Sequence, residues 1–235
     1  MAKSKQKQKQ KQKAKPTEGK KVLIVDDHPV VRRGLSDLID GEPGLEVCGQ
    51  VSGPGGALKA MAEHLPDVAV VDISLGDASG LELIKQLKAQ DPKLRVLVVS
   101  MHDEDLYAER ALRAGAHGYI MKSEPPESIL QALRCVADGK PYVSEAMSSR
   151  LIAQLAGVEK TEDTSPASVL SDRELEVFEL LGRGLATAQI ADALSLSVKT
   201  VQTHRENLKR KLGVHNSTEL IQQAVLWWQE QAGAH

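Results

Sequence analysis

The feature that most constrains the fold is a run of four apolar residues, Val68–Val71, that ends abruptly at Asp72. Unbroken, mostly β-branched runs of this length are typical of strands buried on both faces of a parallel sheet. An acidic residue at the carboxyl end of such a strand occupies the position where open α/β sheets bind their ligands. Either Asp72 belongs to a functional site, or it only ends the strand and caps the following segment.

Apolar runs alternate with amphipathic helical patterns from Lys21 to Lys140. The runs predict strands at 22–25, 45–51, 68–71, 96–99 and 118–121. The helical patterns lie at 30–39, 57–64, 81–89, 106–114 and 128–137. Five strand–helix units of this length predict an α/β fold with a five-stranded, doubly wound parallel sheet.

The pattern changes after Pro141. A helix is predicted at 144–155, and the polar stretch 156–167 is typical of a linker. Helices are then predicted at 171–183, 187–194, 198–212 and 218–231, with a capping box formed by Ser171 and Glu174. This part of the chain is predicted to be a small all-α domain that contains a helix-turn-helix.

The composition is that of an ordinary globular protein, with 41% apolar and 26% charged residues. No apolar run approaches the roughly 20 residues that span a bilayer, and no secretion signal is recognisable. Cys48 and Cys135 lack metal-ligand spacing and are predicted to be reduced core residues. We therefore expect a cytoplasmic protein without membrane contact.

The charge is distributed unevenly along the chain. Nine lysines against Glu18 give the first 21 residues a net charge of +8, which leaves −10 for the rest of a chain whose total is −2. The Lys-Gln alternation has no apolar face, so residues 1–20 are predicted to be a disordered basic tail. The tail either holds DNA phosphates or is simply solvated.

Acidic residues also follow the first predicted strand, at Asp26 and Asp27. Because the first and third strands are neighbours in this topology, these side chains should converge with Asp72. Crowded carboxylates repel one another unless a cation is present, and Mg²⁺ prefers oxygen ligands. Ser100 and Lys122, at the ends of the fourth and fifth strands, would flank them. This set of groups suits phosphoryl transfer to a carboxylate.

Several features occur in a family's order and spacing: Asp26-Asp27-His28-Pro29, Asp72, Gly80, Ser100, and Gly118 to Lys122. In these features, residues 21–141 resemble the receiver domain of bacterial two-component response regulators. The resemblance implies that a histidine kinase phosphorylates Asp72. It implies that Mg²⁺ binds Asp27, Asp72 and the Ser74 backbone carbonyl directly, and Asp26 through water. It also implies that Ser100 and Lys122 stabilise the phosphoryl group and that Tyr119 is the aromatic switch residue.

Three positions of the receiver-like part depart from the family pattern. Leu75 and Gly76 stand where Met-Pro is usual, and Ser123 stands where a proline usually follows the lysine. Glycine leaves the first turn more flexible than proline would. The departures affect the expected lifetime of a phosphoryl group more than its chemistry.

The segment Val198–Leu212 is a basic amphipathic helix and the second helix of the helix-turn-helix. Gln and Arg can contact base edges, and Lys and Arg can reach phosphates. Residues 168–224 resemble the LuxR-type DNA-binding domain of the NarL/FixJ class in the motifs Leu170 to Glu174, Ile190-Ala191, Thr200-Val201 and Lys211 to Val214. The resemblance implies base contacts by Gln202, Thr203 and Glu206, and phosphate contacts by Lys199, Thr200, Arg205 and Lys209. It further implies a homodimer on double-stranded DNA, and it allows contact with RNA polymerase.

Three functions compete on this sequence. The first is a phosphorylation-dependent transcription factor, with domains at 1–20 (tail), 21–141 (receiver), 142–167 (linker with a helix) and 168–235 (DNA-binding domain). It would not be an enzyme that turns over an external substrate. The second is a phosphatase with an aspartyl nucleophile, although Ser74 stands where such enzymes carry a second acid. The third is a DNA-binding protein that does not depend on phosphorylation. The sequence does not identify the kinase, the operator, or activation versus repression.

Overall fold

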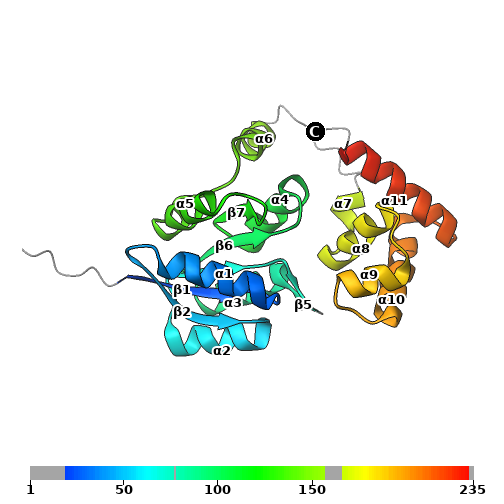
Figure 1. Cartoon of the computed structure of the whole chain (residues 1–235). Coiled ribbons are helices and arrows are strands. Elements are labelled where there is room, and N and C mark those ends of the chain that lie inside the picture. The colour runs from blue at the N-terminus through cyan, green and yellow to red at the C-terminus, as the bar shows by residue number, and fades with distance from the viewer. Residues whose placement is uncertain (1–18, 77, 157–165, 233–235) are drawn as a thin grey trace, which may run out of the picture.

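The computed structural model describes residues 19–76, 78–156 and 166–232. The predicted basic tail, 1–20, lies outside the described residues except for its last two positions. None of the described helices combines the length and apolar character needed to cross a membrane. Figure 1 shows an α/β part, a helix that follows it, and an all-helical part.

The α/β part alternates strands and helices. Its elements are β1 (Lys20–Val25), α1 (Pro29–Asp40), β2 (Leu45–Val51), α2 (Pro54–His64), β3 (Val68–Val71), β4 (Ser74–Leu75), β5 (Ala78–Ser79), α3 (Gly80–Gln90), β6 (Arg95–Ser100), α4 (Glu104–Ala114), β7 (Gly118–Met121) and α5 (Pro126–Ala137). The main sheet is parallel and has the strand order β2-β1-β3-β6-β7. The predicted doubly wound five-stranded sheet is therefore confirmed.

Alternate residues of each strand pack against different helices. Val22 and Ile24 of β1 join a cluster with residues of α1 and α5, whereas Leu23 and Val25 join a cluster with residues of α2, α3 and α4. Every residue of β3 is buried, as its uninterrupted apolar run predicts. Helices thus cover both faces of the sheet. A ligand can reach the sheet at the carboxyl ends of its strands.

Several helices begin earlier than apolar periodicity predicts, and three of these begin at a proline. They start at Pro29, Pro54 and Pro126. Proline fits the first turn of a helix because its fixed φ is already helical and the missing N–H has no acceptor there. Periodicity alone misses such turns because they carry no apolar stripe.

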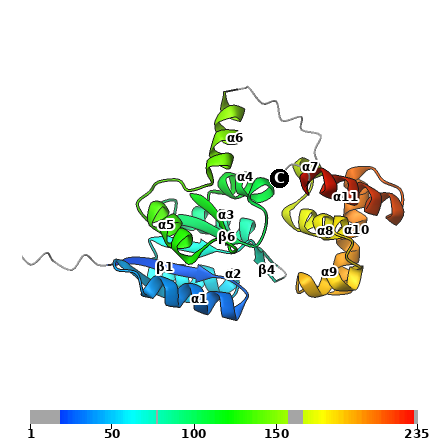
Figure 2. The ribbon, with the colours of Figure 1, turned by 45° about the horizontal axis from the view of Figure 1, so that its top comes forward.

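The remaining elements are helical: α6 (Glu145–Leu155), α7 (Pro166–Val169), α8 (Asp172–Gly182), α9 (Thr187–Ala193), α10 (Val198–Leu212) and α11 (Ser217–Ala232). The short α7 begins inside the stretch predicted as a linker. At the start of α8, the Ser171 backbone N–H donates to Glu174 Oε2 over 2.9 Å, as the predicted capping box requires. Figure 2 shows α8 and α9 on the side of the helical part that faces the α/β part.

Candidate functional site

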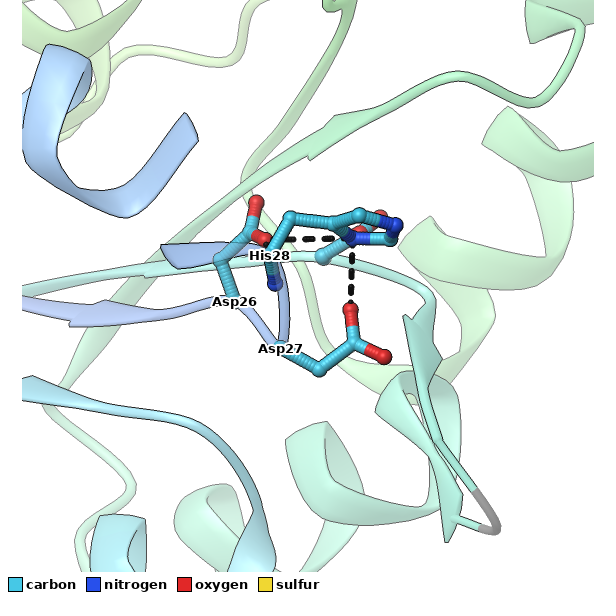
Figure 3. Close-up of side chains that lie close together, drawn as sticks. Asp26, Asp27 and His28 are labelled. Carbon is cyan, nitrogen blue, oxygen red and sulfur yellow. Dashed lines mark hydrogen bonds and ion pairs between the residues drawn. The ribbon is translucent and has the colours of Figure 1, made fainter. Parts of the chain in front are cut away.

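The acidic residues converge where β1 and β3 end. Asp72 continues the sheet ladder, since its backbone N–H donates to the Val25 carbonyl over 2.9 Å. Ligand atoms of Asp26, Asp27, His28 and Asp72 all lie within 4.8 Å of one another. Asp26 and Asp72 are almost completely buried, with 1% and 4% of their surface exposed. The structure therefore brings together the three carboxylates predicted from the sequence and adds an imidazole. Figure 3 shows Asp26, Asp27 and His28 of this group.

Lys122 reaches the same pocket from the end of β7. Its backbone N–H donates to the Ser100 carbonyl over 2.7 Å, and its Nζ lies 2.6 Å from Asp72 Oδ2 and 2.7 Å from Asp26 Oδ2. Burial lowers the pKa of Lys122, but the charges of Asp72 and Asp26 outweigh burial and raise it, so the ammonium is retained. Burial raises the pKa of Asp72, and Lys122 opposes that rise.

The carboxylates carry more negative charge than Lys122 can neutralise. Three carboxylates against one ammonium leave about two negative charges in a pocket of low dielectric. Asp72 Oδ1 is also buried and accepts no hydrogen bond from any residue that the structure describes. A divalent cation with oxygen ligands satisfies both the charge and the unpaired oxygen, so the residues present fit Mg²⁺.

Ser100 and Tyr119 lie beside this pocket and are fully buried. The Tyr119 hydroxyl donates to the His102 carbonyl over 2.8 Å, and the His102 backbone N–H donates to Ser100 Oγ over 3.3 Å. Burial raises the pKa of Tyr119 well above its ordinary value, so its hydroxyl stays protonated. His102 therefore links the two predicted switch residues, a role that sequence reasoning missed.

The Ser74 side chain points away from the acidic pocket. Its Oγ lies 2.9 Å from His102 Nε2 and donates to Glu176 Oε1 over 3.5 Å. Ser74 begins a two-stranded hairpin of β4 and β5 that the sequence suggested only as a turn. The predicted role of Ser74 as a metal ligand depends on its backbone carbonyl. The side-chain contacts do not test that role, so it stays a prediction.

Two glycines shape the loop after Asp72. Gly76 has φ +62°, which favours glycine, and its N–H donates to Asp27 Oδ2 over 2.9 Å. Proline, usual in the family at this position, could adopt neither that φ nor that hydrogen bond. At Gly80, an added Cβ would lie 1.9 Å from the Asp72 carbonyl oxygen. The departure at Gly76 therefore holds one of the acidic side chains in place.

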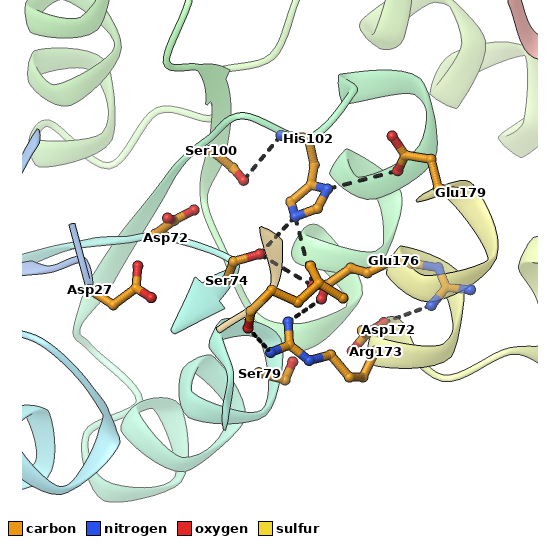
Figure 4. Close-up of polar contacts among 12 residues, drawn as sticks. Asp27, Asp72, Ser74, Ser79, Ser100, His102, Asp172, Arg173, Glu176 and Glu179 are labelled. Carbon is orange, nitrogen blue, oxygen red and sulfur yellow. Dashed lines mark hydrogen bonds and ion pairs between the residues drawn. The ribbon is translucent and has the colours of Figure 1, made fainter. Parts of the chain in front are cut away.

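The all-helical part covers this edge of the sheet through α8. His102 Nε2 lies 3.7 Å from Glu176 Oε1, and His102 Nδ1 lies 3.9 Å from Glu179 Oε2 (Figure 4). Burial lowers the pKa of His102, but Glu179 and Glu176 outweigh burial and raise it. A cavity of about 430 Å³ is lined by Asp72, Lys122 and both glutamates. The pocket of Asp72 thus lies partly beneath two acidic residues of α8.

Two arginines strengthen this contact. Arg110 of α4 pairs with Asp172 over 2.6 Å and donates to the Leu170 carbonyl over 3.0 Å. Arg173 of α8 donates to the Gly76 carbonyl and pairs with Glu176. Sequence reasoning did not predict these contacts. Helix α8 packs on several sides, since its residues 174–179 are all buried, but this burial is known only from the structure.

The predicted DNA-contacting residues lie on α10. Lys199, Gln202, Thr203 and Glu206 are exposed. The other three are half-buried: Thr200 Oγ1 lies 2.8 Å from Ser197 Oγ, Arg205 donates to Thr187 Oγ1 over 2.5 Å, and Lys209 pairs with Glu206 over 2.9 Å. The hydrogen bonds and ion pairs described above between the α/β part and the helical part involve α8 and Leu170 just before it, and none of them involves α10. The side of α10 that carries Gln202, Thr203 and Glu206 is therefore open to solvent.

The last helix presents apolar residues on two sides. Trp227 is buried against Phe178, with ring centroids 5.4 Å apart. Trp228 is half-buried beneath the Arg183 guanidinium, which lies 5.3 Å from its ring centroid. Adjacent residues of a helix point in different directions, so only Trp227 of the two belongs to the core. Ile221 and Leu226 are the exposed apolar residues of α11.

Comparisons with known proteins agree with this arrangement. Residues 22–134 match the family described as the response regulator receiver domain, and residues 168–224 match the luxR family of bacterial regulatory proteins. The oxygen regulatory protein NreC of Staphylococcus haemolyticus is 34% identical over 209 residues, which cover 87% of this chain and 96% of NreC.

Two solved structures of response regulators are also similar to this chain. A LuxR-family response regulator from Aurantimonas is 30% identical, with a TM-score of 0.54 over 59% of this chain and 99% of that chain. Salmonella enterica RcsB, bound to a promoter in the presence of the phosphomimetic BeF3−, is 26% identical, with a TM-score of 0.56 over 88% and 98% of the two chains. This chain therefore belongs to the two-component response regulators of the NarL/FixJ class, which join a receiver domain to a LuxR-type DNA-binding domain.

Proposed function

We propose that a histidine kinase phosphorylates Asp72 and that this modification controls how α10 binds DNA. The observation that carries the proposal is the buried, unpaired Asp72 Oδ1 beside Lys122. As a response regulator, the chain controls DNA binding and transcription. The proposed division is a basic tail (1–20), receiver (21–141), linker (142–167) and DNA-binding domain (168–235).

The pocket supplies what in-line phosphoryl transfer needs. One carboxylate oxygen of Asp72 attacks the phosphorus, the bond to the phosphodonor breaks, and the donor group leaves with the bonding electron pair. Lys122 Nζ neutralises one phosphoryl oxygen and the Ser100 hydroxyl donates to another. Mg²⁺ held by Asp27, Asp72 and the Ser74 carbonyl, with Asp26 through water, supplies charge neutralisation when bound. We propose that the protein turns over no external substrate.

The contact with α8 gives phosphorylation a physical route to the DNA-binding domain. A phosphoryl group would bring up to two negative charges into a cavity that Glu176 and Glu179 also line. Like charges in a low-dielectric cavity repel one another, so the modification favours separation of α8 from the receiver. His102 and Ser74, which contact Glu176, lie between the two groups and would transmit the change.

Separated DNA-binding domains are then free to pair. We propose that two copies bind inverted half-sites on double-stranded DNA, with Gln202, Thr203 and Glu206 toward the bases and Lys199, Thr200, Arg205 and Lys209 toward phosphates. The exposed Ile221 and Leu226 of α11 offer an apolar surface for pairing. RNA polymerase would be contacted from the same assembly, and the lysine tail would add affinity that depends on salt.

Phosphorylation is tested by labelling the full chain with a small phosphodonor in the presence of Mg²⁺. Asp72→Ala should abolish the label, whereas Asp37→Ala, an exposed carboxylate on α1, should leave it unchanged. Label that survives in the Asp72 variant would show that another group accepts phosphate.

The coupling is tested by small-angle scattering and DNA selection with and without beryllofluoride and Mg²⁺. The mimic should increase the dimensions of the monomer or produce a dimer, and it should raise affinity for the selected site. Unchanged dimensions and affinity would instead favour a DNA-binding protein that does not depend on phosphorylation.

A further inference from the structure

His28 stands out because the mechanism above gives it no task, yet its ring lies against the acidic pocket. Its Nδ1 lies 2.7 Å from Asp27 Oδ1 and 3.6 Å from Asp26 Oδ1 (Figure 3). The residue is the N-cap of α1, but its side chain makes no capping hydrogen bond. Its backbone N–H donates to Asp26 Oδ1 over 2.8 Å, which fixes the residue beside the carboxylates.

The spacing of these atoms is that of ligands around one ion. Two neighbouring ligands at about 2.1 Å from a metal ion are roughly 3 Å apart when they subtend a right angle. The 2.7 Å between His28 Nδ1 and Asp27 Oδ1 is close to this value, and Asp72 shares the same 4.8 Å cluster. Two of these carboxylates are nine-tenths buried or more, and Asp72 Oδ1 accepts no hydrogen bond from the described residues.

An imidazole nitrogen changes which ion this set prefers. Carboxylate and carbonyl oxygens suit Mg²⁺, whereas imidazole suits zinc, iron, nickel and copper. A neutral nitrogen ligand also adds no negative charge, so the pocket still needs a divalent ion. Because 61% of the His28 side chain is exposed, an ion can reach Nδ1 from solvent without any opening of the domain.

We propose that His28 Nδ1 is a metal ligand, and that the acidic pocket binds first-row divalent transition ions in preference to Mg²⁺. This inference concerns the cation that binds beside Asp72, and its biological meaning rests on the function proposed above. The binding itself requires no phosphoryl transfer. Under it, His28, Asp27 and Asp72 hold the ion directly, while Lys122 continues to neutralise Asp26 and the remaining oxygen of Asp72.

The experiment measures metal binding to the full chain without any phosphodonor. Co²⁺ is the probe, because its visible absorption reports nitrogen ligation, and Mg²⁺ is titrated separately by calorimetry. His28→Ala should weaken Co²⁺ binding about tenfold or more and alter its absorption band, while Mg²⁺ binding changes less than about twofold. His64→Ala, an exposed histidine at the end of α2, is the matched control and should change neither.

Asp27→Asn is the second variant and should weaken both ions, since it removes a ligand that both use. If His28→Ala weakens the two ions equally, or weakens neither, the proposal is overturned and His28 only pairs with Asp27. The proposed function is judged separately, by Mg²⁺-dependent labelling of Asp72 in the same preparation. If Asp72 is not labelled but His28→Ala weakens only Co²⁺ binding, the proposed function is contradicted and the role of His28 as a ligand is not. Unchanged Mg²⁺ binding also shows that the pocket of the His28 variant is folded.

Discussion

The receiver and helix α8 of the DNA-binding domain each carry a group of acidic side chains, three aspartates in the receiver and three glutamates in α8. Those of the receiver are Asp26, Asp27 and Asp72, and those of α8 are Glu174, Glu176 and Glu179. All three glutamates are buried, as are Asp26 and Asp72. The two groups differ in how their charge is neutralised.

Each glutamate of α8 has its own basic partner within the DNA-binding domain. Glu174 pairs with Lys211 over 2.6 Å, and Glu179 pairs with Arg183 over 3.6 Å. Glu176 pairs with Arg173, and burial raises the pKa of Glu176 while His102 and Arg173 lower it. These one-to-one pairs neutralise the charges of the glutamates within the fold, although the buried Glu179 Oε2 accepts no hydrogen bond from the described residues.

In the receiver, Asp26 and Asp72 share Lys122, and Asp27 lies beside the His28 ring; among the described residues no other lysine or arginine forms an ion pair with these three carboxylates. The charge that remains is a cost to the folded receiver and a source of affinity for whatever cation neutralises it. A protein retains such a cost where binding or chemistry requires it. The contrast therefore distinguishes a structural group of carboxylates from a functional one.

The largest loss of stability is expected when Lys122 is replaced. Lys122→Met leaves Asp26 and Asp72 without their ammonium and should cost about 3–5 kcal/mol of unfolding free energy, of which Mg²⁺ restores a part. Lys211→Met, whose side chain is 35% exposed, should cost about 1 kcal/mol or less. Urea unfolding with and without Mg²⁺ measures both, and equal losses would contradict the distinction.

The receiver group also depends on close backbone packing at Gly80. Gly80→Ala would place Cβ 1.9 Å from the Asp72 carbonyl oxygen, and we expect a loss of about 3 kcal/mol, seen as a lower urea midpoint. At Gly34 an added Cβ meets nothing within 4 Å, so Gly34→Ala in α1 should stabilise by about 0.5–1 kcal/mol. A Gly80 variant as stable as the wild type would show that the loop relaxes freely.

The boundary between the two groups is weakened by Arg110→Met, which removes the ion pair with Asp172 and the bond to the Leu170 carbonyl. Charge-assisted bonds of this kind contribute about 1.5–3 kcal/mol, so the domains should separate more often. A larger radius of gyration by small-angle scattering checks this. Arg113→Met, on the same helix with an 80% exposed side chain, is the control and should leave the dimensions unchanged.

The smallest effect is expected at Glu174. Burial raises the pKa of Glu174, but Lys211 and Ser171 outweigh burial and lower it from its ordinary value of 4.5. A lowered pKa in the folded state contributes stability at neutral pH that is lost as pH falls below that value. Glu174→Gln should thus cost about 1 kcal/mol at pH 7 and progressively less in acid. Thermal unfolding across pH measures the stability difference between the wild type and Glu174→Gln. A difference that grows in acid would contradict the lowered pKa of Glu174.

The fold was predictable because its signals are local. Uninterrupted runs such as Val68–Val71 specify buried parallel strands, and Ser171 with Glu174 specifies a helix start. The convergence of Asp26, Asp27 and Asp72 followed from strand adjacency, which the topology determines. Lys122 and Ser100 were placed by the same reasoning.

The contact between the domains was not predictable, because it depends on side chains distant in sequence. Arg110 and Asp172 are 62 residues apart, and nothing in either neighbourhood indicates the other. His102 lay outside the predicted site because a single histidine after a strand carries no periodic signal. Cys48 and Cys135 are free, as expected, but they are half-buried, since periodicity does not distinguish the margin of a core from its centre.

Gly76 has one consequence that concerns measurement. Its amide proton is bonded to Asp27, a carboxylate of the acidic pocket, and its carbonyl accepts from Arg173 of α8. The rate at which this one proton exchanges with deuterium should therefore respond to cation binding through Asp27. The carbonyl carbon chemical shift of the same residue should respond to separation of the domains. Recorded together by nuclear magnetic resonance, the two signals would time both events from a single position in the chain.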